Sequence, residues 1–195
     1  HIILPYHIAL DQLKEKLKKQ DAIGTTGKGI GPTYADKASR VGVRVGELKN
    51  LKELEQKLGS YYKEIQIVLH SLGGEAPSFE SMMSELEKMS KKILPFVCDS
   101  TQFLWEAQRA GKKILLEGAQ GSMLDLDHGT YPFVTSSTTM SSGACSGSGI
   151  NVKELDEIIG IAKAYCTRVG NGPFPSEEFG EIGEEIQKRG GEFGT

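Results

Sequence analysis

A glycine- and threonine-rich stretch near the start of the sequence could bind phosphate. It reads IGTTGKGIGPTYADKASR from Ile23 to Arg40. Glycine loops expose backbone N–H groups that suit phosphate oxygens, and Lys37 and Arg40 share one face if they lie on a helix. The stretch is not a Walker A loop, because Lys28 is followed by Gly29 and not by Ser or Thr. Two interpretations stay open: a phosphate-binding loop, or a glycine-rich connector that leads into a helix with solvated cations.

A second stretch, from Leu116 to Ser137, combines amide, hydroxyl and carboxylate side chains in the sequence LEGAQGSMLDLDHGTYPFVTSS. A side-chain amide both donates and accepts, so such a loop can read the edge of a nucleotide base. Asp125, Asp127 and His128 could suggest a metal site, but one histidine and two carboxylates on a loop more often make local hydrogen bonds. The same argument speaks against His128 as a catalytic base, and we predict no metal ligand in this chain.

The hydrophobic pattern predicts the elements that hold these two stretches. Leucine and isoleucine recur at three- and four-residue steps over residues 47–72, as in an amphipathic helix. Two apolar runs, 113–117 and 159–169, read as buried strands. Alternating strands and helices predict an α/β fold with a mainly parallel sheet, helices and long glycine-rich ligand loops at the strand ends. Further helices are predicted at 8–20, 78–89, 100–110 and 181–188, and Gly111 is expected just after the third of these. Asn151 is expected to open one more short helix. Loops are predicted at 21–46 and 118–150.

The composition excludes several classes of function. The net charge of the 195 residues is −3, which points neither to nucleic acid nor to a membrane surface. No apolar run approaches the roughly 18 residues of a spanning helix. Cys98, Cys145 and Cys166 are odd in number and widely spaced, which argues against disulfides or a zinc site and fits a cytoplasmic location. The sequence begins and ends within apolar or patterned runs, so we expect a portion of a longer protein.

Three segments resemble the adenylosuccinate synthetase family. They are GIGPTYADKASR at 29–40, EGAQGSMLDLDHGTYPFVTSS at 117–137 and AYCTRVGNGPFP at 164–175, in the family's order and approximate spacing. The resemblance implies a ligase of AMP biosynthesis that uses GTP and Mg²⁺ and joins IMP to L-aspartate through 6-phosphoryl-IMP. It also implies that 1–195 is the central portion of one larger domain, part of a P-loop-NTPase-like sheet, with a helical insertion at about 47–110 and no complete second domain.

The resemblance also assigns roles to single residues. Arg40 matches the arginine that reaches across a homodimer interface to the IMP phosphate of the neighbouring subunit. Gln120 is expected to hold the purine 6-oxygen where charge develops, and Lys37 matches a lysine near the active site, so these two are the expected catalytic residues. The expected IMP-binding residues are Thr26, Arg40, Gln120 and Thr135, together with Leu124 and Val169, which match positions lining the nucleotide pocket.

Two family motifs do not occur in the sequence. The family's aspartate base lies in a GDEGKGK-type loop and its general-acid histidine in a Gly-His-Thr segment, and neither string is present. The aspartate-binding and guanine-reading segments are expected beyond Thr195. We therefore expect this chain to carry mainly the IMP side of the site, to lack most ligands of GTP and Mg²⁺, and to be inactive alone. The alternatives are a stand-alone nucleotide-binding module without catalysis and an interaction domain whose loops are structural.

Overall fold

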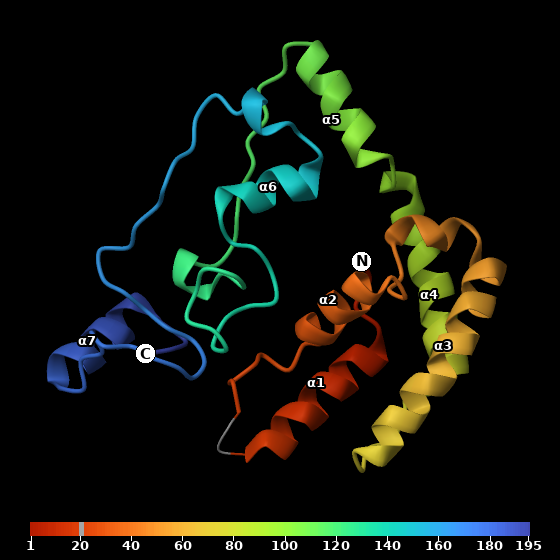
Figure 1. Cartoon of the computed structure of the whole chain (residues 1–195), viewed down its shortest axis with the longest axis horizontal. Helices are drawn as coiled ribbons and strands as arrows, with labels where there is room; N and C mark the ends of the chain where they lie inside the picture. The colour runs from red at the N-terminus through yellow and green to blue at the C-terminus, as the bar shows by residue number, and fades with distance from the viewer. Residues whose placement is uncertain (20–21) are drawn as a thin grey trace. The chain divides into compact units, whose positions relative to one another are not determined.

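The computed structural model describes residues 1–19 and 22–195, and within them every regular element is a helix (Figure 1). These residues form two compact units, 1–19 with 25–114 and 22–24 with 115–195. None of the described helices is long and apolar enough to cross a membrane. The α-helices are α1 (Pro5–Lys18), α2 (Ile30–Ser39), α3 (Leu51–Ser71), α4 (Phe79–Ile93), α5 (Ser100–Arg109), α6 (Ser141–Ser148) and α7 (Glu181–Gly190), and the 3-10 helices are η2 (Val45–Lys49), η3 (Leu94–Phe96), η4 (Ser122–Leu124) and η5 (Val152–Glu154).

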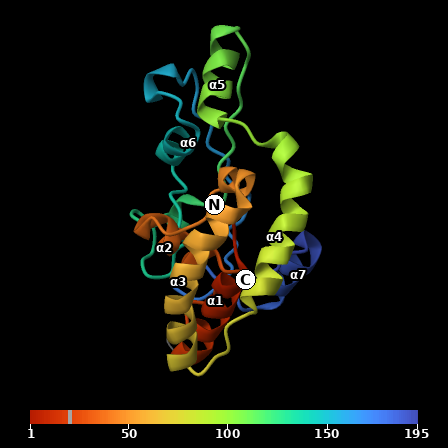
Figure 2. The same cartoon turned by 90° about the vertical axis from the view of Figure 1, so that its right-hand side faces the viewer.

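The hydrophobic core of the first unit is built around α3, which packs against α1 and α4 (Figure 2). The helix predicted at 47–72 is confirmed over Leu51–Ser71, and the Asn50 side chain caps it by accepting a hydrogen bond from the Glu53 N–H. Burial of the leucine stripe drives this packing, because apolar area leaves water on one face of the helix. The buried residues of the cluster are Leu4, Tyr6, Leu10, Val43, Leu48, Leu54, Leu58, Tyr62, Ile65, Leu69, Met82 and Leu86.

The predictions for α1, α4, α5 and α7 are confirmed, with ends that differ by a few residues. Residue 20, the expected end of the first helix, lies outside the described residues. Gly111 follows α5 with a φ of 69°, the left-handed conformation that ends many helices. Asn151 accepts a hydrogen bond from the Lys153 N–H as a cap should, but the helix that follows is only the single turn η5.

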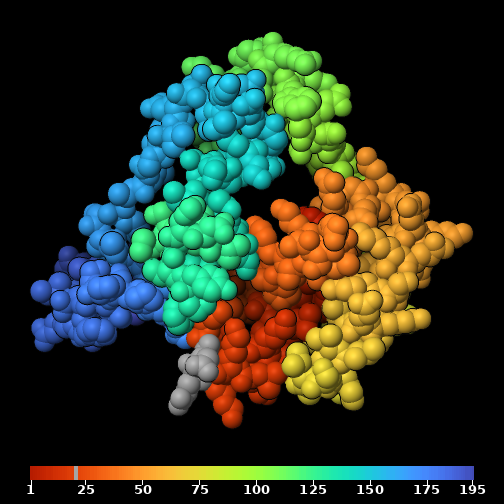
Figure 3. Space-filling model, viewed as in Figure 1, coloured from red at the N-terminus to blue at the C-terminus, as the bar shows by residue number. Residues whose placement is uncertain are grey.

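The predicted α/β fold with a parallel sheet is wrong for this chain, because the described residues form no strand. The runs 113–117 and 159–169 are irregular instead. A strand exists only through backbone hydrogen bonds to a neighbouring strand. Within the described residues, Arg168 at the end of the second run exchanges backbone hydrogen bonds with Thr195, but this single pair does not extend into a strand. Leu115 is 87% exposed and Ile161 96% exposed. The space-filling view shows the segment between α6 and α7 as a narrow strip (Figure 3). Local apolar pattern is therefore insufficient to produce a sheet here.

The predicted loops 21–46 and 118–150 contain helices that the pattern did not indicate. In α2 the buried side chains are the polar Thr33 and Asp36, so the hydrophobic pattern does not indicate this helix. The other missed helix, α6, has the sequence SSGACSGS, whose small residues carry no apolar stripe. Both errors share one cause: the face that each helix presents is not marked by large apolar residues.

A buried carboxylate joins α1, α2 and α3. Asp36 on α2 accepts hydrogen bonds from the Tyr6 hydroxyl (2.8 Å) and the His7 Nε2–H (2.9 Å) of α1, and from the Tyr61 hydroxyl (2.8 Å) of α3. Burial alone would raise the pKa of Asp36, but the hydrogen bonds from His7, Tyr6 and Tyr61 outweigh it and hold this pKa below its usual range. The three helices are therefore joined through one ionised group.

His7 is held in a single tautomer by its two ring partners. Its Nδ1 accepts a hydrogen bond from the Leu4 N–H at 2.8 Å, so this nitrogen carries no proton. The proton therefore lies on Nε2, which donates to Asp36. The His7 side chain is completely buried. The start of α1 and the orientation of the imidazole are thus coupled through the same ring.

We expect Asp36→Asn to lower the free energy of unfolding of the full-length protein by about 1 to 3 kcal/mol, because an amide NH₂ would face the donors that a carboxylate satisfies. The depressed pKa also gives a pH dependence: this stabilisation is complete above the ordinary carboxyl pKa of about 4 and is lost as the pH falls through the lower folded-state value. Urea unfolding between pH 3 and pH 7 tests this. The exposed Asp156→Asn is the control, and equal stability of the two variants would contradict the prediction.

Candidate functional site

The glycine-rich loop before α2 is held against α1 by a second buried carboxylate. Asp11 accepts hydrogen bonds from the Gly29 N–H at 2.9 Å and from the Thr25 hydroxyl at 3.1 Å. Gln12 of the same helix donates to the Gly27 carbonyl at 3.3 Å. Thr26 lies between these anchors and is exposed. The loop is therefore fixed on both sides of Thr26, which presents this residue to solvent on a constrained backbone.

Gly29 is the position where the loop approaches α1 most closely. Its φ is 79°, and a Cβ there would lie 2.9 Å from the His7 carbonyl carbon and 2.9 Å from the Ile8 nitrogen. Backbone atoms cannot move aside cheaply, so only glycine fits here. This glycine therefore has a packing role, which agrees with the connector interpretation for this one residue.

The two cations of the first stretch lie at the far end of α2. Lys37 is in the last turn, with its ammonium 5.7 Å from the centre of the Tyr34 ring, and Arg40 caps the helix with a φ of 64°. Both are exposed. A ten-residue helix is about 15 Å long, so the structure separates Thr26 from Arg40 instead of bringing them together. Within the described part of the chain, the Arg40 guanidinium has no ion-pair partner.

The second stretch folds around Asp125, which is completely buried. One oxygen accepts from the Asp127 and His128 N–H groups, each at 3.0 Å, and the other from the Thr139 N–H at 2.7 Å and the Met140 N–H at 3.4 Å. Desolvation by burial would raise the pKa of Asp125, but these backbone hydrogen bonds outweigh it and lower the pKa. Asp125 thus connects the two ends of the loop by four donors.

The Asp125 loop brings two predicted site residues together. The Thr135 N–H donates to the Leu124 carbonyl at 2.9 Å, and both residues are half-buried. Gln120 lies just before this turn and is exposed. The Thr139 hydroxyl donates to the carbonyl of Gly121, the next residue, at 3.0 Å. Gln120 is therefore held at the edge of an ordered loop, with its side chain accessible.

The local hydrogen-bonding interpretation of Asp125 is the one the structure supports. Both of its oxygens accept backbone donors, and the described residues contain no group of three or more His, Cys, Asp or Glu side chains that could hold a metal ion. Asp127 and His128 are exposed and supply backbone N–H groups to this network. The residues present therefore do not fit a magnesium site.

Arg168 was not singled out from the sequence, yet it connects three segments of the second unit. Its guanidinium donates to the Phe133 carbonyl at 3.0 Å and to the Asn171 carbonyl at 2.9 Å. Asn171 in turn donates to the Ala22 and Ile23 carbonyls at 2.6 and 3.0 Å. The neighbouring Val169, a predicted pocket residue, is 47% exposed. Only the position of Arg168 within the third segment, AYCTRVGNGPFP, could have drawn attention to it.

Two predicted site residues have strained backbones. The non-glycine residues with positive φ in the described part are Lys19, Arg40 and Gln120, the last with a φ of 63°. This conformation costs roughly 1 kcal/mol or more for a residue with a Cβ, and such outliers concentrate at functional sites. At Arg40 this backbone ends α2, where the Arg40 N–H donates to the Asp36 and Lys37 carbonyls, so the conformation has a structural cause at this position.

Comparison with known proteins covers the whole chain. The family model described as "Adenylosuccinate synthetase" matches residues 1–195. The chain is 62% identical to the adenylosuccinate synthetase of Helicobacter hepaticus and 55% identical to that of Wolinella succinogenes, in each case over all of this chain and 47% of the relative. A structure of fully ligated adenylosuccinate synthetase from Plasmodium falciparum aligns with a TM-score of 0.93 at 37% identity, over 100% of this chain and 46% of that one. The chain spans about half the length of these relatives.

We expect Asp125→Asn in the full-length protein to loosen the 122–140 loop, because the amide would present hydrogens to two backbone donors. The local opening free energy should fall by about 1 to 3 kcal/mol. Hydrogen exchange followed by mass spectrometry should show faster exchange in peptides covering 127–128 and 139–140. Asp127→Asn, which alters an exposed carboxylate two residues away, is the control. Unchanged exchange in Asp125→Asn would show that the carboxylate does not hold the loop.

Proposed function

Because this chain belongs to the adenylosuccinate synthetase family, we propose that the full-length protein joins IMP and L-aspartate to form adenylosuccinate, with hydrolysis of GTP in the presence of Mg²⁺. The reaction is a step of AMP biosynthesis and proceeds through 6-phosphoryl-IMP. This chain supplies mainly the IMP side of the site, as the central portion of a larger domain with its helical insertion at about 47–110. We further propose that the protein works in the cytoplasm, where its three free cysteines stay reduced.

The observation that carries the proposal is the family match over all 195 residues. The exposure of the predicted ligand residues and their free side chains also support it. Thr26, Arg40 and Gln120 are exposed, and their side chains make no hydrogen bond within the described residues. Polar side chains left free on anchored, partly strained backbones are suited to binding a ligand rather than to holding the fold.

Gln120 has the chemistry that the phosphorylation step requires. Its amide N–H donates to the purine 6-oxygen, and this hydrogen bond strengthens as negative charge develops on that oxygen. Only the extra stabilisation in the transition state raises the rate. Thr26 and Thr135 hold the nucleotide through hydroxyl groups, Leu124 and Val169 line its apolar surface, and Lys37 supplies positive charge near the reacting groups.

Arg40 acts on the neighbouring subunit of a homodimer. Thr26 and Arg40 of one chain lie at opposite ends of α2, too far apart to bind the same phosphate group. The free guanidinium at the helix end is available to a second copy of the chain instead. A planar guanidinium binds phosphate through two parallel hydrogen bonds, which fixes the position of IMP as well as its charge.

The groups that bind GTP, Mg²⁺ and aspartate are assigned to other parts of the full-length protein. The described residues offer no cluster of metal ligands, and the family's base and acid motifs do not occur in the sequence. We therefore assign no metal-dependent step to the residues of this chain. Its own residues bind IMP, orient the purine ring and stabilise charge on the 6-oxygen.

We predict that the 195-residue chain alone forms no adenylosuccinate from IMP, GTP and aspartate, whereas the full-length protein does. Loss of a single general acid or oxyanion donor typically lowers the rate by two or more orders of magnitude, and this sequence contains neither the family's base nor its acid. Spectrophotometric detection of the product tests both forms at equal concentration. Turnover by the isolated chain would refute its assignment to the IMP side alone, and an inactive full-length protein would refute the proposed reaction.

Gln120→Met in the full-length enzyme keeps the side-chain volume and removes the polar atoms. We expect kcat to fall by roughly 10²-fold or more, the loss seen for one oxyanion donor. The KM for IMP should change much less, because the other IMP contacts remain. Steady-state kinetics and the thermal midpoint should be measured together. A normal kcat with a greatly raised KM for IMP would restrict Gln120 to binding, and a lower thermal midpoint with equal effects on all substrates would make it structural.

The role of Arg40 across subunits can be tested by mixing inactive variants. Subunits carrying Arg40→Leu are combined with subunits whose aspartate base is replaced. If Arg40 acts on the partner's site, a mixed dimer contains one intact site, and part of the activity should return. The Arg40→Lys enzyme keeps the positive charge and loses the planar fork of the guanidinium, so its activity should be lower than that of the wild type. Absence of recovery despite demonstrated subunit exchange would place Arg40 in its own subunit's site.

A further inference from the structure

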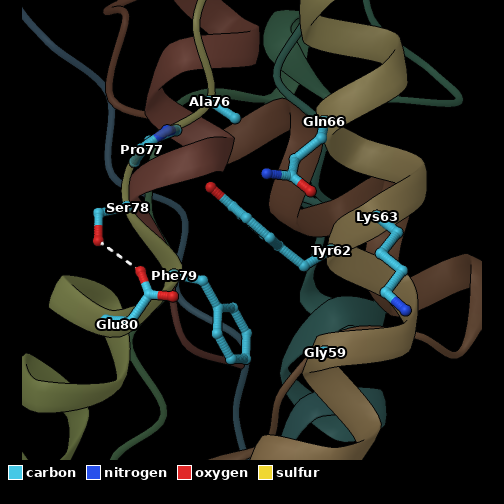
Figure 4. A pocket seen from close by; sticks show the side chains of 9 residues that line it. All are labelled: Gly59, Tyr62, Lys63, Gln66, Ala76, Pro77, Ser78, Phe79 and Glu80. Carbon is cyan, nitrogen blue, oxygen red and sulfur yellow. Dashed lines mark hydrogen bonds between the residues drawn. The ribbon is translucent and has the colours of Figure 1, made fainter.

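A cavity of about 410 Å³ that is open to solvent lies between α3 and the start of α4 with the segment before it (Figure 4). One wall is formed by Gly59, Tyr62 and Gln66 of α3, and the other by Pro77 and Phe79. The Tyr62 and Phe79 rings pack with their centres 5.2 Å apart, which gives the cavity an apolar floor. Its volume lies within the range of small-molecule sites. None of the residues proposed to bind IMP lines it.

The hydroxyl of Tyr62 is the unusual feature of this cavity. The Tyr62 residue is 4% exposed, and its hydroxyl oxygen is the buried side-chain atom without a hydrogen-bond partner in the described part of the chain. A buried hydroxyl normally finds a partner, because leaving it unpaired is unfavourable. Burial and the nearby Glu80 carboxylate raise the pKa of Tyr62, so the group stays a donor at neutral pH. Figure 4 shows the Gln66 amide on the same side of the cavity as this hydroxyl.

Gly59, in the middle of α3, leaves room for a methyl group beside Phe79. Glycine is unfavourable inside a helix relative to alanine, yet no crowding requires it here. A Cβ at Gly59 would meet only the tip of the Phe79 ring, at an ordinary contact distance of 3.7 Å. The missing methyl group therefore enlarges the cavity beside an aromatic ring, at a cost to helix stability that packing does not explain.

We propose that this cavity binds a small neutral molecule that combines an apolar ring with a carboxamide group. The ring lies against Phe79 next to Gly59, and the amide oxygen accepts the hydrogen bond from the Tyr62 hydroxyl. The ligand N–H donates to the Gln66 side-chain oxygen, because an amide pairs with another amide through one donor and one acceptor. The hydroxyl is itself buried, so the ligand reaches it only when side chains that line the cavity, such as the exposed Gln66, move aside. A neutral ligand suits the site because its lining holds one ammonium group, on Lys63, and one carboxylate, on Glu80, which balance in charge.

Benzamide is the probe for this site, with toluene as the matched ring without an amide and benzoate as its anionic analogue. Ligand-observed saturation-transfer titrations use the full-length protein with IMP present, so that the proposed nucleotide site is occupied. We expect benzamide to bind with a Kd on the order of 1 mM and roughly 3- to 10-fold more tightly than toluene, the contribution of one hydrogen bond. Benzoate should bind less well than benzamide.

Two substitutions separate binding from folding. Tyr62→Phe should reduce benzamide binding to the level of toluene, and Gly59→Ala should weaken both probes by filling the space beside Phe79. Both variants should have thermal midpoints equal to or above that of the wild type, since one removes an unpaired hydroxyl and the other a helical glycine. Gly46→Ala, which adds a methyl group in open space, is the control and should bind like the wild type.

Three results would overturn the proposal. The first is the absence of saturable benzamide binding to the wild type. The second is equal benzamide affinity in the wild type and Tyr62→Phe. The third is a clear loss of stability in Tyr62→Phe, which would show that the hydroxyl has a partner within the folded protein. All three are independent of the synthetase reaction, because catalytic activity is not their readout.

Discussion

Asp36 receives three side-chain hydrogen bonds from two other helices, and the arrangement of the first unit depends on this buried carboxylate. An ionised group that leaves water must be satisfied by donors of the protein, because an unpaired buried charge is strongly unfavourable. Tyr6 and His7 therefore fix the start of α1 against α2, and Tyr61 fixes α3. The hydrophobic core holds these helices together, while Asp36 defines their register.

The same physical solution recurs in the segments that carry the proposed nucleotide contacts. Asp11 anchors the loop around Thr26, and Asp125 anchors the loop that carries Leu124 and Thr135. In each case a buried or nearly buried acid satisfies backbone N–H groups that a glycine-rich or irregular chain would otherwise leave unpaired. Hydrogen bonds to these carboxylates thus hold the two loops where no regular secondary structure does. Rigid loops of this kind can present free polar side chains in a defined geometry.

Motif residues divide into those that build the fold and those that face solvent. Within the segment 29–40, Gly29, Thr33 and Asp36 are buried and structural, whereas Lys37 and Arg40 are exposed. Arg40 and Gln120 also keep left-handed backbones without being glycine. Selection for folding alone would favour glycine at these positions. Arg40 adopts this backbone as the residue that ends α2, and the strained backbone of Gln120 agrees with the proposed contact of its side chain to IMP.

The sequence by itself determined the long amphipathic helix α3, the ends of α5 and the family, because these depend on local periodicity, local capping and contiguous motifs. It did not determine α2 or α6, whose buried faces are polar or small, and it predicted a sheet from two runs that form no strand among the described residues. It indicated Gln120 and Arg40 as site residues, but not the roles of Asp11, Asp125 and Arg168. Those roles arise from hydrogen bonds between residues distant in sequence, such as Asp11 with Gly29 and Asp125 with Thr139. Only the tertiary structure decides such pairings, because a carboxylate's partner depends on which backbone donors the packed chain brings within reach.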